Sequence, residues 1–391
     1  MTKDIRHRQA GLLLLLLLLF AACGSDSESL SPDPNKQVGT LNIYVYPADD
    51  PMVTRADEGL VNAYNAENTV KSLKIWVFKH ASATDTDEPL HYLAPTEPEL
   101  QGSRAKLFQI ALTQAQVDVL KANDGQVDLY VLANAESVGL ATLAENATRA
   151  EVRDAVIASD FFGTTTLITA TDLATNGLPM SGNSENISVQ GTLPVLSLPV
   201  VKLTRCVSKL RFVMAQNPDA DAEISINSLQ LNGSLFPTTE QVFNRTDNPY
   251  SISGTYISSD TYFPPPTEVA KYDRVSELVY LSQNIQDYED IVDEVVEKEY
   301  ATQLGPYYFR ESDKCLTGTV NYSITDKEDP SKTETKQASF SMSDVPGQYN
   351  FSRNHTWTVY IYYLGGEELE LILAYVKNWS DGNTEHGVFN W

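Results

Sequence analysis

The chain is poor in cysteine, histidine and basic residues. Its 391 residues include three cysteines and five histidines, and 28 Lys and Arg stand against 52 Asp and Glu, which gives a formal net charge of −24. Three cysteines are too few for a disulfide-dense scaffold or a cysteine-rich metal site. The acidic balance argues against nucleic acid as a partner, because phosphate binding needs a basic surface.

Short motifs of catalytic and cofactor sites are also missing. The sequence has no Gly-rich phosphate loop, no His-Glu-x-x-His, no Cys-x-x-Cys and no Gly-x-Ser-x-Gly. Its histidines are scattered, without the spacing of metal ligands. We therefore expect no enzymatic activity, no cofactor and no bound metal.

The N-terminus has the pattern of an export signal. Three basic residues precede an apolar run, Gly11 to Ala22, whose 12 residues are well short of the ~20 that span a bilayer as a helix. Small residues then lead directly into Cys23, as at the cleavage site of bacterial lipoproteins. This pattern predicts a signal peptide over residues 1–22 and acylation of Cys23. An ordinary secretory signal with a chance cysteine is the alternative.

The stretch from Gly39 to Glu58 combines a strand with an exposed loop. Leu41, Ile43 and Val45 alternate with polar and aromatic residues, which predicts a strand with one aliphatic face. Proline and aspartate follow, and the loop ends at a lone basic residue, Arg55, before Ala56. A protease that cuts after Arg55 would detach the strand. We interpret the strand as a placeholder that another copy of the protein replaces, and we expect the emptied groove to lie beside Val70–His80.

The remaining chain reads as two successive sets of short strands. Thr148 and Glu151 form a capping box that predicts a helix over Thr148–Ala158. Residues 178–183 are predicted to form a turn, and residues 193–200 a proline-containing crossing between the two domains. Residues 235–275 are predicted to form long loops, and residues 287–299 a solvated acidic helix or loop. Strands are predicted at Val70–His80, Arg104–Leu112, Gln126–Asn134, Leu203–Met214, Glu223–Leu231, Ser276–Ser282, Leu316–Ile324, Thr333–Met342 and Asn354–Leu364. The pattern predicts an all-β fold of two β-sandwich domains, residues 56–198 and 199–366.

Two cysteines remain once Cys23 is acylated. Cys206 shares its strand parity with core-facing residues, whereas Cys315 shares its own with Thr317 and Thr319. Two separate thiols are therefore favoured over a disulfide, although an exported protein permits one.

Several stretches resemble the fimbrillins, the subunits of the type V pili of Bacteroidales. The two processing points are Cys23 and Arg55, and the other similar stretches follow in the family's order. The segment Tyr307–Ser312 departs from the family pattern, because Ser312 stands where an asparagine is usual. The similar stretches are Asp128–Asn134, Leu178–Gly182, Leu203–Leu210, Tyr307–Ser312 and Ser352–Val359.

This resemblance implies two tandem transthyretin-like β-sandwich domains and no enzymatic role. It implies export as a lipoprotein anchored in the outer membrane by lipid on the precursor. An arginine-specific protease then removes residues 23–55, the lipidated propeptide with its placeholder strand. The C-terminal strand of another subunit fills the groove, which builds a cell-surface fimbrium that supports adhesion. The Arg55 site points to a stalk or a tip subunit and does not separate the two.

The last segment, residues 367–391, offers two registers for such a donor strand. Leu369, Leu371 and Leu373 share one face, and Ile372 and Val376 share the other. Gly365–Gly366 precede them as a hinge. The alternative is that this segment is simply the last strand of the second domain.

A second function stays open at this point. The chain could be a lipid-anchored surface lipoprotein that binds a glycan or protein and is never cut or polymerised. Acylated Cys23 on the surface-extracted protein would favour that function, and a free Ala56 would favour the pilin.

Overall fold

The structure is a computed structural model, and it describes most of the chain beyond residue 34. The described residues are 35–46, 67, 69–80, 86–95, 98, 100, 105–122, 124–138, 143–157, 177–243, 252–282, 288–341, 351–376 and 384–385. For residues 137–138, 252–254, 289–290, 372–376 and 384–385 only the backbone is described. Within these ranges, no helix has both the length and the apolar composition of a membrane span.

The N-terminal half, here the described residues 35–205, contains two five-stranded sheets. Sheet A holds β1 (Gln37–Tyr46), β4 (Lys106–Thr113), β8 (Gln190–Thr192), β9 (Val195–Ser197) and β10 (Val201–Lys202). Sheet B has the order β11 (Thr204–Arg205), β7 (Met180–Ser188), β5 (Gln126–Ala133), β2 (Leu73–Lys79) and β3 (His91–Leu93). Aliphatic side chains from both sheets form one buried core between them. The helical elements are α3 (Gln114–Ala122), η1 (Ala135–Val138) and α4 (Arg149–Arg153).

The C-terminal half, here the described residues 206–385, is a second sandwich. Sheet D has the order β17 (Thr302–Phe309), β12 (Ser208–Gln216), β20 (Thr356–Tyr363), β21 (Glu370–Val376) and β22 (Thr384–Glu385). Sheet E has the order β16 (Thr261–Phe263), β13 (Ala222–Leu231), β18 (Thr317–Asp326) and β19 (Thr333–Ser341). Their facing side chains form a second core. Two helices, α6 (Val275–Ser282) and α7 (Tyr288–Glu297), pack on the outer face of sheet D through another apolar cluster.

A small third sheet joins the two halves. Its strands are β15 (Ile252–Tyr256), β14 (Pro237–Gln241) and β6 (Val156–Ile157). Because β14 comes from the C-terminal half and β6 from the N-terminal half, main-chain pairing crosses the junction at Glu240–Ile157 and Gln241–Val156. An apolar cluster with members from both halves, among them Trp76 and Phe243, surrounds this pairing.

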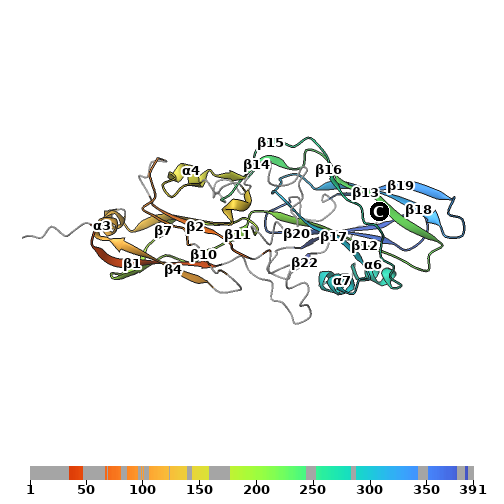
Figure 1. The fold of residues 1–391 in the computed structure, drawn as a ribbon, viewed down its shortest axis with the longest axis horizontal. Coiled ribbons are helices and arrows are strands. Elements are labelled where there is room, and N and C mark those ends of the chain that lie inside the picture. The colour runs from red at the N-terminus through yellow and green to blue at the C-terminus, as the bar shows by residue number, and fades with distance from the viewer. Residues whose placement is uncertain are drawn as a thin grey trace, which may run out of the picture.

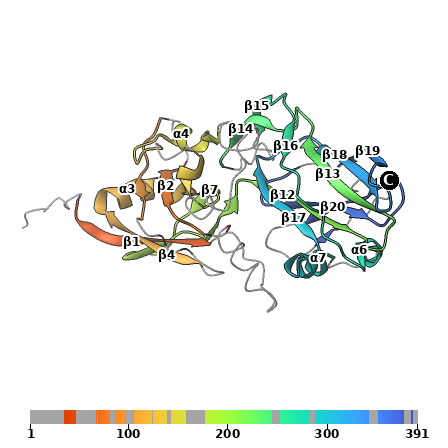
Figure 2. The ribbon, with the colours of Figure 1, turned by 45° about the vertical axis from the view of Figure 1, so that its right-hand side comes forward.

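The described part of the molecule is elongated, with the two sandwiches end to end (Figure 1). The turned view separates the lobes and shows α6 and α7 on one side of the C-terminal lobe (Figure 2). The all-β sandwich fold expected from the sequence is confirmed. The exact boundaries at residues 56, 198 and 366 stay predictions.

Several local predictions are wrong, and tertiary packing explains why. Residues 178–183 do not form a turn, because β7 begins at Met180 and pairs with the central strand β5. The crossing at 193–200 includes β9, which pairs with β1. The helix at Thr148 has its capping box but stops at Arg153, where the chain turns into β6. Residues 235–275 contain three short strands, and the expected strand at 276–282 is α6.

Candidate functional site

The first strand, β1, lies inside its sheet and not at an edge. On one side it pairs antiparallel with β4 along its length, from Gln37–Thr113 to Val45–Lys106. On its other side it pairs in parallel with β9 at residues 40–42 and with β10 at residues 45–46. Without β1, sheet A would therefore have a slot with a strand on both sides.

The inward face of β1 carries the aliphatic residues expected from the sequence. Leu41, Ile43 and Val45 are buried in the core of the N-terminal half. On the same face of sheet A, Leu41 lies opposite Ile110 and Ile43 lies opposite Phe108, and these side chains belong to the core between sheets A and B. Their alternation requires that any replacing strand present apolar groups with the same period of two.

The outward face and the ends of β1 are also fitted to their neighbours. The side chain of Gln109 donates to Asn42 across the strand pair at 3.1 Å. Gly39 lies so close to the next segment that a Cβ there would approach the Pro194 carbonyl oxygen within 2.8 Å. The backbone of β1 is thus held by close approach on the β9 side and by side-chain pairing on the β4 side.

The position of the groove differs from the expectation that it lies beside Val70–His80. That segment forms β2, which belongs to sheet B and faces β1 across the core. The main-chain neighbours of β1 are Lys106–Thr113 and the β9–β10 stretch. The sequence predicted the strand at 70–80 correctly but could not assign it to a sheet, because both sheets are apolar toward the same core.

The predicted processing points fall outside the described residues. Cys23, Arg55 and Ala56 lie in the segments 1–34 and 47–66, which the structure leaves undescribed. Residues 47–66 are the covalent connection between β1 and everything that follows. The next described residue is Glu67, and it is fixed in the junction between the halves.

Glu67 forms a buried ion pair across that junction. The Lys209 Nζ donates to its two carboxylate oxygens at 3.2 and 3.0 Å, and the Tyr308 hydroxyl donates to Oε1 at 2.5 Å. Burial lowers the pKa of Lys209 from its ordinary value, and the Glu67 carboxylate acts in the opposite direction. The chain after the predicted cut is therefore anchored to the C-terminal half independently of β1.

The predicted donor residues lie in and just before β21. This strand pairs antiparallel with β20 from Glu370–Tyr362 to Val376–Thr356, a range that includes Leu373 and Ile372. Leu369 and Leu371 are buried in the core of the C-terminal half. Gly365 and Gly366, the expected hinge, both have positive φ, at 119° and 90°. In this structure residues Glu370–Val376 are thus the fourth strand of sheet D, and a donor role for these residues requires them to leave that place.

A charged cluster at the junction was not predicted from the sequence. Arg353 donates to the Glu240 carboxylate at 2.7 Å and to the Glu311 carboxylate at 3.2 Å, and all three side chains are buried. Desolvation raises the pKa of Glu240 to about 8, which the Arg353 guanidinium opposes and the Glu311 carboxylate reinforces. The partners are far apart in sequence, so no local pattern could have connected them.

Four of the stretches that carry the resemblance meet around this cluster. The Ser181 hydroxyl and the Arg353 guanidinium both donate to the Val242 carbonyl oxygen, at 2.6 and 2.9 Å. The buried thiol of Cys206 lies 3.3 Å from the Ser181 hydroxyl, and no disulfide joins it to Cys315. These motif residues therefore hold the two halves together.

The motif glycine has a separate role next to the slot. Gly182 lies in β7, and a Cβ there would approach the Lys202 carbonyl oxygen of β10 within 2.6 Å. Only glycine permits this approach. Because β10 is one of the strands that flank β1, the motif positions a wall of the slot.

The fold and the buried β1 define an elongated, double-sandwich, all-β protein whose first strand is an interior strand. Residues 40–193, which begin within β1 and span the N-terminal half, match the family model of the major fimbrial subunit protein FimA. This match supports the resemblance to the fimbrillins seen in the sequence, which is confirmed for the N-terminal half.

Among solved structures, the chain is similar to two proteins that are described as fimbrial. One is a fimbrial assembly protein from Parabacteroides distasonis ATCC 8503, with 14% identity, a TM-score of 0.44, and 90% of this chain and 100% of that chain covered. Another is a fimbrial protein from Bacteroides vulgatus ATCC 8482, with 10% identity, a TM-score of 0.43, and coverage of 88% and 100%. No curated protein matches the chain.

Proposed function

We propose that the chain is a stalk or tip subunit of a cell-surface fimbrium that polymerises by strand exchange and supports adhesion. The precursor is exported as a lipoprotein acylated at Cys23 and reaches the outer membrane. An arginine-specific protease cuts after Arg55, β1 leaves, and a strand from another subunit enters the slot. The match of residues 40–193 to the fimbrial subunit family supports the cell-surface location.

The observation that carries this proposal is the placement of β1. It is an interior strand joined to the rest of the chain through residues 47–66 alone, and that connection contains Arg55. A cut there leaves β1 attached only by non-covalent contacts. The chain on the other side of the cut stays anchored through the ion pair of Glu67 with Lys209.

Energetics favour replacement of the strand over an empty slot. Burial of the three aliphatic side chains of β1 contributes roughly 5–9 kcal/mol in total, at ~1.5–3 kcal/mol per side chain. This contribution is lost when β1 leaves. Departure of β1 also leaves main-chain donors and acceptors unpaired on β4 and on the β9–β10 stretch. An incoming strand with matching alternation satisfies both edges at once.

The C-terminal segment, residues 367–391, is the proposed donor. Its two faces carry Leu369, Leu371 and Leu373 or Ile372 and Val376, and each offers apolar groups at alternate positions. A contact between one subunit's tail and the next subunit's slot is heterologous, so it propagates into a fibre. Because Leu369 and Leu371 are buried in their own half, release of this segment is a step that competes with assembly.

Variants at the cut site test the proposal. Arg55→Ala should give a precursor that stays monomeric, and Arg55→Lys should do the same, because an arginine-specific protease does not accept lysine. A chain that starts at Ala56 should polymerise without any protease. The measurement is the ladder of oligomers that survives mild heating in SDS.

Persistent ladders from Arg55→Ala would contradict the placeholder role of β1. A monomeric wild-type protein that keeps acylated Cys23 at the cell surface would instead support the surface-binding lipoprotein.

A further inference from the structure

Gly39 sets a steric condition on any strand that takes the place of β1. A Cβ at this position would lie 2.8 Å from the Pro194 carbonyl oxygen and 2.9 Å from the Leu193 Cδ2 atom. The Thr40 amide donates to the same oxygen at 2.8 Å, so the two chains cannot move apart without loss of this hydrogen bond. A strand that pairs in the same way therefore needs glycine where it passes Pro194.

Asn42 sets a second condition, on the outward face of the strand. It is almost fully buried, and its Oδ1 accepts a hydrogen bond from the Gln109 side chain at 3.1 Å. The two residues are directly opposite in the antiparallel pair of β1 and β4. A strand with asparagine three residues after the glycine keeps this hydrogen bond.

The core between the two sheets sets the third condition. Leu41 and Ile43, two and four residues after Gly39, are buried in it. The strand β1 also has a fixed direction, because it is parallel to β9 and antiparallel to β4. Along that direction the slot specifies glycine, any residue, an apolar residue, asparagine and a second apolar residue.

Residues 387–391, Gly-Val-Phe-Asn-Trp, have this order of residue types. Aligned in the direction of β1, each falls on its counterpart: Gly387 on Gly39, Phe389 on Leu41, Asn390 on Asn42 and Trp391 on Ile43. Val388 then falls on Thr40, which lies opposite Val195 of β9. Val195 is 49% exposed, so a valine at this place covers an apolar side chain that β1 leaves open to water.

The two aromatic residues are larger than the side chains that they replace. Departure of β1 also vacates the space of Val45, which follows Ile43 on the same inward face. The indole of Trp391 can extend into that space, and burial of two aromatic rings adds apolar contact area to the pairing.

The segment that contains β21 does not meet the steric condition in either of its registers. With its three leucines turned inward, Glu367 falls at the place of Gly39, and with the Ile372 face turned inward, Glu370 falls there. Both glutamates carry a Cβ. Residues 387–391 meet the condition and leave β21 paired with β20.

One other stretch shares part of the pattern. Residues 59–63, Gly-Leu-Val-Asn-Ala, have the glycine and the asparagine in the same places. Their second inward residue is alanine, which leaves most of the Ile43 pocket empty, so the slot favours residues 387–391.

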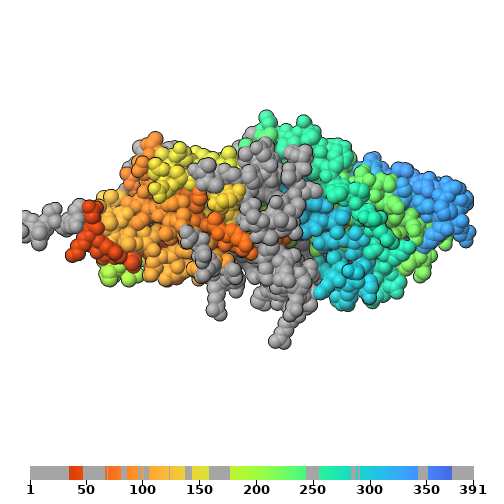
Figure 3. Space-filling model, viewed as in Figure 1, coloured from red at the N-terminus to blue at the C-terminus, as the bar shows by residue number. Residues whose placement is uncertain are grey.

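We propose that residues 387–391 of one subunit enter the slot of another copy, with Gly387 at the place of Gly39. The proposal rests on strand exchange as the mode of assembly, and it names the donor residues and their register. Part of β1 forms the surface at the end of the N-terminal half, away from the other sandwich, so a second copy can reach the slot (Figure 3).

A disulfide between subunits tests the register. Asn390 should lie opposite Gln109 of the next subunit, as Asn42 does in the precursor, at the ~4.5–5.5 Å Cα distance of antiparallel partners. The full-length double variant Gln109→Cys, Asn390→Cys, with Cys315→Ser, is cut after Arg55 and oxidised. It should give a ladder that survives boiling in SDS without reductant and disappears with reductant.

Three matched pairs place the second cysteine elsewhere, each with Gln109→Cys. Glu370→Cys and Leu373→Cys take the place of Asn42 in the two β21 registers, and Asn62→Cys takes it for the alanine-containing stretch. These pairs should give neither a disulfide-linked ladder nor a disulfide within one subunit.

Substitution of the glycine tests the steric condition. Gly387→Val should reduce assembly of the cut protein roughly tenfold, because its side chain meets the Pro194 carbonyl oxygen. Gly382→Val changes a glycine of the same segment outside the proposed contact, and it should assemble as the unchanged protein does.

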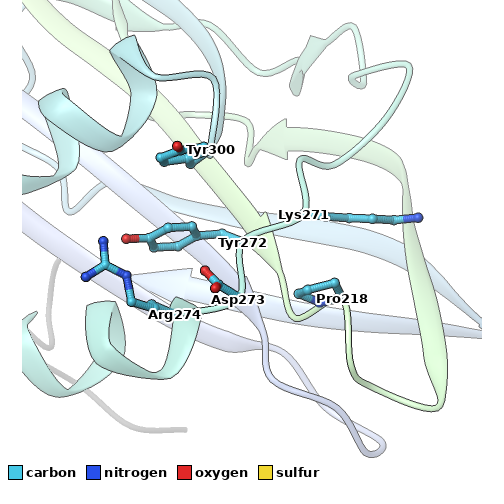
Figure 4. A pocket seen from close by; sticks show the side chains of 6 residues that line it. All are labelled: Pro218, Lys271, Tyr272, Asp273, Arg274 and Tyr300. Atoms are coloured by element: carbon cyan, nitrogen blue, oxygen red, sulfur yellow. The ribbon is translucent and has the colours of Figure 1, made fainter.

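Loss of an aromatic ring gives a second comparison. Phe389→Ala should reduce assembly, because it leaves the Leu41 pocket empty. Tyr300→Ala is the control, since the ring of Tyr300 is 45% exposed and stacks on Tyr272 in the C-terminal half (Figure 4). This variant should assemble normally.

The disulfide-linked ladder of the Asn390→Cys pair, together with the loss in Gly387→Val, would support the register. A ladder from one of the β21 pairs, or normal assembly of Gly387→Val, would overturn it and leave strand exchange standing. A disulfide within one subunit from the Asn62→Cys pair would also overturn it. Absence of polymers from the unchanged protein after the cut would overturn strand exchange itself, and this register with it.

Discussion

Asn134 directly follows the buried strand β5, and its side chain binds two other backbone segments, residues 69–71 and Leu178. Its amide oxygen accepts from the Lys71 amide at 2.7 Å, and its amide nitrogen donates to the carbonyls of Thr69 and Leu178 at 2.9 and 2.6 Å. Its φ of 57° is a conformation that asparagine tolerates and most residues do not. One residue thus combines a backbone role with a hydrogen-bonding role.

Substitution separates the two roles of Asn134. We expect Asn134→Ala to lower the free energy of unfolding by about 2–4 kcal/mol, since it strands buried backbone groups and adds left-handed strain. Asn186 has a similar φ of 54° but is exposed, so Asn186→Ala should cost only about 1 kcal/mol. Urea unfolding of both variants measures the difference. Equal losses would show that the Asn134 hydrogen bonds contribute little.

The Glu240 carboxyl predicts a pH dependence of the junction. Its pKa is raised by burial to about 8, although Arg353 lies against it, because Glu311 shares the same guanidinium. The folded state then binds a proton that the unfolded state releases above ~4.3, the ordinary pKa of glutamate. Stability contributed by this group is complete below that pH and is lost as pH rises to about 8.

We therefore expect the free energy of unfolding to fall by roughly 1 kcal/mol per pH unit between about 5 and 8 through this group. Glu240→Gln should flatten the profile over that range, because glutamine does not titrate. Thermal or urea unfolding at several pH values is the measurement. An unchanged slope in the variant would mean that Glu240 is already ionised in the folded protein.

At the scale of elements, β1 can be locked in place by a disulfide. Asn42 and Gln109 are directly opposite on β1 and β4, and their side chains meet on the outward face. Antiparallel partners lie ~4.5–5.5 Å apart at Cα, within the range of a disulfide. In the double variant Asn42→Cys, Gln109→Cys, protein cut after Arg55 should stay monomeric when oxidised and polymerise after reduction.

The single variants serve as controls for that lock, and both should polymerise under either condition. Polymerisation of the oxidised double variant would show that β1 need not leave. The measurement is the same as for the cut-site variants, namely the ladder of oligomers that survives mild heating in SDS.

A charged substitution in the proposed donor segment does not test assembly alone. Leu371 is buried in the core of the C-terminal half, so Leu371→Glu should destabilise the monomer as well as assembly. We expect a loss of about 3 kcal/mol in the free energy of unfolding. A monomer that keeps its melting temperature would indicate that β21 contributes little to its own half.

Some elements could be predicted from local pattern and others could not. The strands β2, β5 and β13 carry strong apolar alternation or continuous apolar runs, and all were predicted close to their observed bounds. The helix α6 was read as a strand, although its buried residues Val275, Leu278 and Ser282 have helical spacing. That signal was present but short.

Other features depend on contacts between distant parts of the chain. The strand β7 is rich in serine, asparagine and glycine, which favour turns, and it forms a strand because it pairs with β5. The inward residues of β1 were predictable from their alternation. The strands that flank β1 were not predictable, because the sequence of one segment does not show which remote segment it pairs with.

At the scale of the whole molecule, charge opposes assembly. A formal net charge of −24 makes subunits repel one another at low ionic strength. The Debye length falls from ~30 Å at about 10 mM salt to ~8 Å at about 150 mM, so salt should accelerate association. We expect the polymerisation rate of the cut protein, followed by light scattering, to rise several-fold over this range. A rate that falls with salt would point to attraction between charged patches.

The junction makes the two sandwiches one continuous body. The β6–β14 pairing, the apolar cluster around Trp76 and Phe243, and the ion pair of Glu67 with Lys209 all cross it. A subunit built in this way can transmit force along its length, with the proposed acceptor slot in one half and the proposed donor in the other.

The most direct test of the account is the N-terminus of the subunit within purified fimbriae. Intact mass and N-terminal sequencing of the assembled subunit should give a chain that begins at Ala56 and lacks residues 23–55, β1 included. An assembled subunit that begins at acylated Cys23 and retains Leu41, Ile43 and Val45 would contradict the exchange of this strand.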